Sequence, residues 1–120
     1  MKKEIIDNPR YPHHIRIVRK VYGDWLSESS EEYREVVVYD GCGRSYTDTT
    51  TTGDSRVDMN KRKASIPVRY DEWREGLIPL SGDMLYVTKG DITEEWEVKD
   101  FEPDNNRSVV YGQMNRNLNS

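Results

Sequence analysis

The chain has 120 residues, of which 34% are hydrophobic and 33% are charged, and its formal net charge is −4. This length fits a single domain, and a mean hydropathy of −0.94 leaves apolar residues for only a small core. The 18 basic and 22 acidic residues are divided evenly between the two halves of the sequence, which excludes the extended basic surface that tight non-specific binding of DNA or RNA requires.

Residues 1–13 are predicted to form an extended N-terminal arm. They contain Pro9 and Pro12 on either side of Tyr11, and the residue before a proline is pushed toward extended conformations. The alternative is a frayed terminus.

The first strand is predicted over residues 14–22. Ile15 and Ile17 alternate with polar residues, and the pattern is interrupted near Val18, which indicates a β-bulge. Residues 25–32 are polar and fit a short helical turn or a hairpin loop; the acidic stretch at 25–35 has no assigned role.

Residues 33–39 are rich in β-branched side chains and predict the second strand. The following Asp-Gly-Cys-Gly at residues 40–43 has the composition of a turn.

A long polar loop is then predicted between the second and third strands. Connections in compact domains usually have about 4–6 residues, so a much longer one is either functional or disordered. Two arginines and three aspartates give this loop a net charge of −1. The loop consists of Arg44, Ser45, Tyr46, Thr47, Asp48, Thr49, Thr50, Thr51, Thr52, Gly53, Asp54, Ser55, Arg56, Val57, Asp58, Met59 and Asn60.

Four more strands are predicted, at residues 61–70, 84–89, 93–101 and 108–114. Pro67 indicates that the third strand either lies at an edge or ends there. Six short strands separated by turn residues favour a mainly β fold, a small β-barrel or sandwich spanning residues 14–114. Residues 115–120 are expected to be a frayed tail.

Catalytic and metal-binding patterns are not found in the sequence. His13, His14 and Cys42 are the only soft metal ligands, and adjacent histidines on an extended chain point to opposite faces. Cys42 lies between two glycines, as a small filler residue would, and as a lone cysteine it excludes an intrachain disulfide. We therefore expect no enzyme activity, no cofactor and no metal.

The aromatic residues divide into two groups. Tyr11, Tyr22 and Trp25 belong either to the core or to contacts with another subunit or partner. Base stacking is disfavoured at Trp96, because Glu95 and Glu97 flank it. We expect the core to contain Trp73, Tyr86, Trp96, Phe101 and Tyr111.

The order of several β-motifs resembles the head-closure, or stopper, proteins of tailed bacteriophages, which belong to the head–tail connector group. The resemblance covers residues 13–114. It is carried by H-I-R-I-V-R (14–19), I-P-V-R-Y (66–70), L-I-P-L-S-G-D (77–83), M-L-Y-V-T-K-G (84–90), W-E-V-K-D-F (96–101), Asn106-Arg107 and S-V-V-Y (108–111).

This resemblance implies a structural protein of the virion neck, assembled in the host cytoplasm. Such proteins form a homo-oligomeric ring, commonly of twelve copies, below the portal and adaptor proteins and above the tail-completion or tail proteins. Each subunit is a small β-barrel whose loop between the second and third strands projects into the channel and retains packaged double-stranded DNA. The matching loop here is residues 44–60.

Other readings of the sequence remain open. A hydroxyl-rich, weakly acidic loop does not grip phosphate, so we expect the DNA to pass without sequence-specific binding. The chain could instead be a tail-completion or tail-terminator ring protein, or a monomeric β-barrel that binds a small partner or nucleic acid. No stretch approaches the ~20 apolar residues of a membrane helix, so a soluble protein without a membrane partner is expected.

Overall fold

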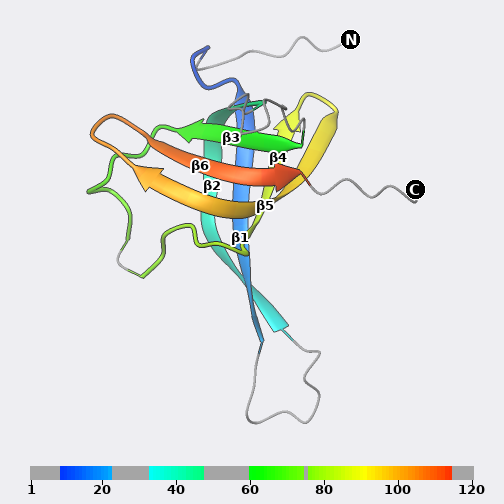
Figure 1. Ribbon diagram of the computed structural model, residues 1–120, viewed down its shortest axis with the longest axis vertical. Coiled ribbons are helices and arrows are strands. Elements are labelled where there is room, and N and C mark those ends of the chain that lie inside the picture. The colour runs from blue at the N-terminus through cyan, green and yellow to red at the C-terminus, as the bar shows by residue number, and fades with distance from the viewer. Residues whose placement is uncertain (1–8, 23–32, 48–59, 75, 115–120) are drawn as a thin grey trace, which may run out of the picture.

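The computed structural model of the chain describes residues 9–22, 33–47, 60–74 and 76–114. Its six strands close into an antiparallel barrel in the order β1-β2-β3-β6-β5-β4, and the described residues contain no helix (Figure 1). The mainly β fold is confirmed, and the barrel is the correct one of the two expected architectures. The strands are β1 (His13–Tyr22), β2 (Tyr33–Thr47), β3 (Lys61–Ile66), β4 (Met84–Lys89), β5 (Ile92–Pro103) and β6 (Ser108–Met114).

The barrel closes through β1, which pairs with β2 on one side and with β4 on the other. The register between β1 and β2 shifts between Ile17 and Val18, so the predicted bulge is confirmed. A bulge bends and twists a strand, and this one lies where β1 reaches the last of its pairs with β4, at Val18.

The third strand ends at Ile66, directly before Pro67. It pairs with β2 on one side and with β6 on the other, so it is not an edge strand. Proline has no backbone N–H to donate to a sheet, which agrees with a strand that stops at this residue.

The second strand is twice as long as the sequence indicates, because the turn predicted at residues 40–43 is wrong. This stretch continues β2, and its residues pair with β1 from Asp40↔Arg16 to Gly43↔His13. A Cβ at position 43 would collide with Cδ1 of Ile15 and lie 3.0 Å from the Ser65 carbonyl oxygen. Close packing inside the barrel, rather than a turn, therefore requires glycine at this position.

The core fills the barrel interior with side chains from all six strands. Trp96 on β5 is the largest fully buried residue. Tyr86 and Tyr111, which we expected in the core, are half-buried, because their strand neighbours on either side face inward instead. The buried core consists of Ile15, Ile17, Val38, Ala64, Ile66, Leu85, Val87, Trp96, Val98 and Val110.

The connection between β3 and β4 packs against this core through Trp73. The Trp73 and Phe101 rings meet edge to face, with centroids 5.2 Å apart. The indole N–H of Trp73 donates to Ser108 Oγ at 2.9 Å, and Ser108 Oγ donates to the Val68 carbonyl at 2.6 Å. These two bonds satisfy the polar atoms that the packing buries.

A two-stranded ribbon made of residues 19–22 and 33–36 extends from the barrel (Figure 1). Along this ribbon, β1 is past the last of its pairs with β4. Tyr22 and Tyr33 stand opposite each other with ring centroids 5.5 Å apart, and they are 60% and 46% exposed. The ribbon therefore carries exposed aromatic surface away from the core.

Candidate functional site

The predicted loop is shorter than expected at its start. Residues 44–47 are the end of β2 and pair with β3, from Arg44↔Ser65 to Thr47↔Arg62. The physical reason is that β3 offers these residues a strand partner, which outweighs their polar composition. Asn60 lies in a turn directly before β3, and residues 48–59 lie outside the described part of the chain.

The two strand ends that carry this loop, residues 44–47 and 60–63, are held by several side-chain contacts. The Tyr46 hydroxyl lies 3.3 Å from Ser65 Oγ, and the Lys63 ammonium lies 5.4 Å from the centre of the Tyr46 ring. Arg62 donates to Thr47 Oγ1 at 3.3 Å. We call these strand ends the loop base; their contacts join β2 to β3 where the loop leaves the barrel.

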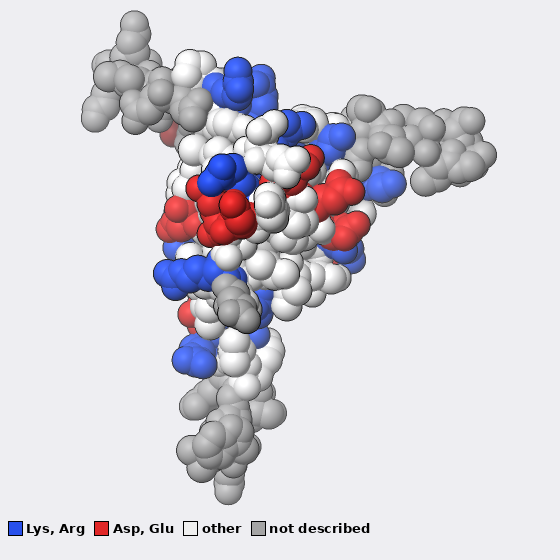
Figure 2. Space-filling model, turned by 90° about the vertical axis from the view of Figure 1, so that its left-hand side faces the viewer, with Lys and Arg blue, Asp and Glu red and all other residues white. Residues whose placement is uncertain are grey.

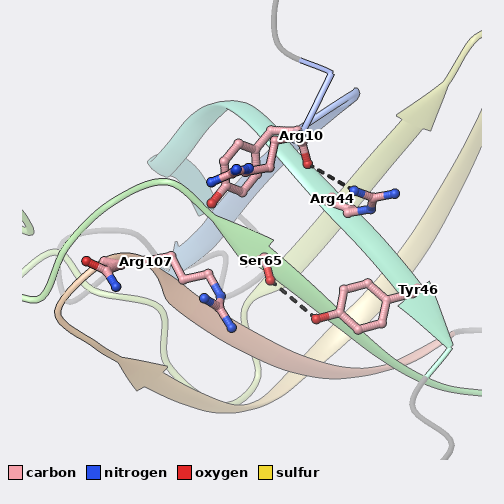
Figure 3. A pocket seen from close by; sticks show the side chains of 7 residues that line it. Arg10, Arg44, Tyr46, Ser65 and Arg107 are labelled. Atoms are coloured by element: carbon pink, nitrogen blue, oxygen red, sulfur yellow. Dashed lines mark hydrogen bonds between the residues drawn. The ribbon is translucent and has the colours of Figure 1, made fainter.

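An open pocket of about 680 Å³ lies beside the loop base (Figure 3). Its walls come from the N-terminal arm, from β2 and β3, and from the turn between β5 and β6. The Tyr46–Ser65 contact lies on one wall. The residues that line the pocket are Arg10, Tyr11, Arg44, Tyr46, Ser65, Asn106 and Arg107.

Three arginines line this pocket and none of its lining residues is acidic. Arg44 donates to the Arg10 carbonyl at 3.4 Å, which joins the arm to β2. Within the described part of the chain, neither Arg44 nor Arg107 forms an ion pair. The pocket is therefore a concave site of positive charge on a chain whose net charge is −4.

Elsewhere the charges are mixed. Figure 2 shows acidic and basic side chains side by side over one face of the barrel. Exposed ion pairs on the barrel surface include Lys99–Glu97, at 3.4 Å, and Arg69–Asp71, at 3.6 Å. Exposed pairs of this kind contribute little stability.

The two adjacent histidines point to different neighbours, as expected for an extended chain. The Ser45 backbone N–H donates to His13 Nδ1 at 3.1 Å, whereas His14 Nε2 lies 2.6 Å from a carboxylate oxygen of Asp40. Burial lowers the pKa of His13, and the charges of Lys89 and Arg44 lower it further against the opposing charge of Glu94. A neutral His13 keeps Nδ1 free to accept the Ser45 hydrogen bond.

The three predicted contact residues do not lie together. Tyr11 lines the pocket beside the loop base. Tyr22 lies on the exposed ribbon against Tyr33, and Trp25 lies outside the described residues. Among the residues that are described, no group of three or more His, Cys, Asp or Glu side chains could hold a metal ion, and no helix is long and apolar enough to span a membrane.

The pocket is not visible in the sequence, because its lining residues belong to separate segments of the chain. Arg10 was part of an arm, Ser65 part of a strand, and Asn106 and Arg107 part of a turn. They meet because β3 pairs with both β2 and β6, which brings the β5–β6 turn near Arg10 and Tyr11. The Asn106-Arg107 pair was noticed in the sequence only as a component of the family resemblance.

Comparison with known proteins returned no match to a family model, a curated protein or a solved structure. The barrel, the loop base and the pocket of this chain are therefore the features from which a function is inferred. Together these features define a small closed β-barrel that carries a long β2–β3 connection and an arginine-lined pocket at its base.

Proposed function

We propose that the chain is a structural protein of the bacteriophage neck, which forms a ring that closes the DNA-filled head and offers an attachment surface to the tail. Residues 48–60 connect β2 to β3 and line or plug the DNA channel. The observation that carries the proposal is the closed six-stranded barrel whose β2–β3 connection is long and polar, since both features are what the resemblance implies. The role is structural rather than catalytic.

The loop base supports this role mechanically. A loop that lines a channel needs a fixed direction, and here the β2–β3 ladder and the Tyr46–Ser65 contact fix both strand ends. The main-chain N–H of Met114 also donates to the Asn60 carbonyl at 2.7 Å, which connects the base to β6. A connection held in this way leaves the barrel at a defined position in every copy of a ring.

The composition of the loop supports passage of DNA rather than tight binding of DNA. Residues 48–59 contain Arg56 and three aspartates, so their formal charge is 1 − 3 = −2. Such a surface releases few counterions from a duplex and binds it weakly. A channel lined by this segment would therefore let DNA pass without binding it tightly.

The exposed ribbon offers a surface for contact between subunits. Tyr22 and Tyr33 are large, exposed and packed against each other, and the Lys20 ammonium lies 4.8 Å from the centre of the Tyr33 ring. Aromatic residues of this kind are common anchors at protein interfaces. We assign the ribbon to contacts with a neighbouring copy or with an adjoining neck ring.

The experiment that tests the proposal removes residues 49–57 from the gene in the phage genome and joins the ends with two glycines. The loop base remains in this variant, so the barrel is expected to fold. Heads should assemble and package DNA but lose it on storage, which a nuclease-protection assay of purified heads measures.

A matched control replaces residues 49–57 with a Gly-Ser sequence of equal length. If the loop acts by its length as a plug, this control retains more DNA than the deletion does. Full retention of DNA by the deletion variant, with the protein present in the heads, would contradict the channel role.

Two other functions make different predictions. A tail-completion or tail-terminator ring would contact tail proteins rather than the portal and adaptor, which crosslinking of purified necks would show. The arginine-lined pocket favours the second alternative, a monomeric binding module. Such a module would bind its ligand as a monomer and be absent from purified virions.

A further inference from the structure

The pocket beside the loop base is not used by the proposed channel role. It is formed by four separate parts of the chain, and Figure 3 shows Arg10, Arg44 and Arg107 placed around Ser65 and Tyr46. Because the chain has more acidic than basic residues, a lining with three arginines and no carboxylate does not follow from composition. These side chains share one chemical property, which is that they donate hydrogen bonds to anions.

The number of donors favours a phosphate over a carboxylate. Each guanidinium presents five N–H donors in a planar fork, and one fork already satisfies both oxygens of a carboxylate. A phosphate monoester has three strong acceptor oxygens and a charge of about −1.5 to −2 at neutral pH. The guanidinium groups of Arg44 and Arg107 match the larger requirement, and the Tyr46–Ser65 hydroxyl pair lies beside them in the pocket lining.

The rest of the pocket fits an organic group attached to that phosphate. A volume of about 680 Å³ is in the range of sites for small organic molecules, and a phosphate alone would leave most of it empty. Tyr11 and Tyr46 supply aromatic rings, on which a nucleobase can stack. Asn106 adds an amide that can both donate and accept.

We propose that this pocket binds a nucleotide through its phosphate monoester, with Arg44 and Arg107 as the main phosphate ligands and Tyr46 beside the base or sugar. Arg10 closes the arm side of the pocket through its carbonyl contact with Arg44. The charge of Arg44 also contributes to lowering the pKa of His13, so its field extends to neighbouring groups on β1.

The same chemistry has two sources, a free nucleotide and the 5′-phosphate at the end of a DNA strand. The pocket lies next to residues 44–47, which lead into the β2–β3 loop, so a strand end in a channel would be within reach if the neck assignment holds. Nucleotide binding itself does not rest on that assignment and is tested on the isolated chain.

The test is a titration of the ¹⁵N-labelled full chain, followed by its amide NMR spectrum in a buffer free of phosphate. Thymidine 5′-monophosphate is compared with thymidine and with inorganic phosphate. We expect the monophosphate to shift the amide signals of the pocket residues. Inorganic phosphate should shift a smaller number of these signals and should require a higher concentration to do so. Thymidine should shift none of them.

Two variants and one control assign the effect to the pocket. Arg44→Gln and Arg107→Gln should each weaken binding of the monophosphate about tenfold, since each removes a charge-assisted hydrogen bond. Arg69→Gln removes the same charge from an exposed residue outside the pocket lining and should leave the affinity unchanged. All three positions are exposed, and the spectrum of each free variant reports that it is folded.

The source is decided by two hairpin DNA duplexes that differ only in a 5′-phosphate. Tighter binding of the phosphorylated duplex supports the strand end, and binding of the monophosphate without that difference supports a free nucleotide. The proposal is overturned if the monophosphate shifts no pocket amide, or if Arg69→Gln weakens binding as much as Arg44→Gln does.

Discussion

Arg19 holds Asp83 with two parallel hydrogen bonds, from Nε to Oδ1 and from Nη2 to Oδ2, each 2.9 Å long. The Asp83 side chain is only 4% exposed, and it also accepts the Leu80 backbone N–H at 2.9 Å. The main-chain N–H of Val98 on β5 donates to the Asp83 carbonyl at 2.8 Å. The Asp83 carboxylate thus joins β1 to the segment before β4, and the Asp83 main chain connects that segment to β5.

We expect Asp83→Asn to lower the free energy of unfolding by about 3 kcal/mol, because it leaves the Arg19 guanidinium partly buried without its counter-charge. Urea denaturation followed by tryptophan fluorescence measures the change. The control, Glu97→Gln, removes a carboxylate from the exposed Lys99 pair and should cost less than about 1 kcal/mol. Equal effects of the two substitutions would contradict the role given to Asp83.

Gly43 on β2 is predicted to tolerate no side chain. Alanine at this position would collide with Ile15 Cδ1 and press on the Ser65 carbonyl, so Gly43→Ala should destabilise the fold by about 1–3 kcal/mol. Gly41→Ala is the matched control on the same strand, since the nearest contacts of its Cβ would be side-chain atoms of Tyr39 rather than backbone. Thermal unfolding followed by circular dichroism should give a lower melting temperature for Gly43→Ala than for Gly41→Ala.

Stability should fall on acidification through His13. Its folded-state pKa lies below the ordinary value of 6.5, so the unfolded chain binds a proton before the folded chain does. The free energy of unfolding therefore rises with pH in this window. The contribution of neutral His13 to the free energy of unfolding is fully present above pH 6.5. It is lost as the pH falls from there through the folded-state pKa of His13.

The comparison of unfolding free energies at pH 7.5 and pH 5.5 checks this expectation. His13→Asn keeps an acceptor for the Ser45 N–H and removes the titrating group, so its stability should depend less on pH than that of the native chain. His14→Asn leaves the His13–Ser45 bond in place and should retain the dependence. A native-like pH dependence in His13→Asn would refute the assignment.

Much of the barrel could be predicted from local patterns. Alternation of apolar residues located the strands, and the break near Val18 located the bulge, because these features are visible within a few residues. The length of β2 was missed because glycine signals both turns and close packing. Only the barrel brings Ile15 against position 43, so sequence alone could not choose between the two meanings.

The candidate site was less predictable than the fold. The polar composition of residues 44–60 identified the segment as a possible loop. It did not show that Arg44 and Tyr46 belong to β2 and pair with β3. The pocket depends on the proximity of the N-terminal arm to the β5–β6 turn, which no local signal encodes. Tyr11 was singled out as a contact residue, and it does line the pocket, although the arginines beside it were not expected there.

The ribbon beyond Val18 has a consequence for how the molecule opens. Residues 19–22 are hydrogen-bonded as strand only to β2 within the described chain, whereas barrel residues such as Ile15 and Ile17 pair on both sides. Amide protons of the ribbon should therefore exchange with solvent through a local opening that leaves the barrel intact. The molecule would contain two cooperative units, and a partner that adds to the ribbon would slow exchange in one of them alone.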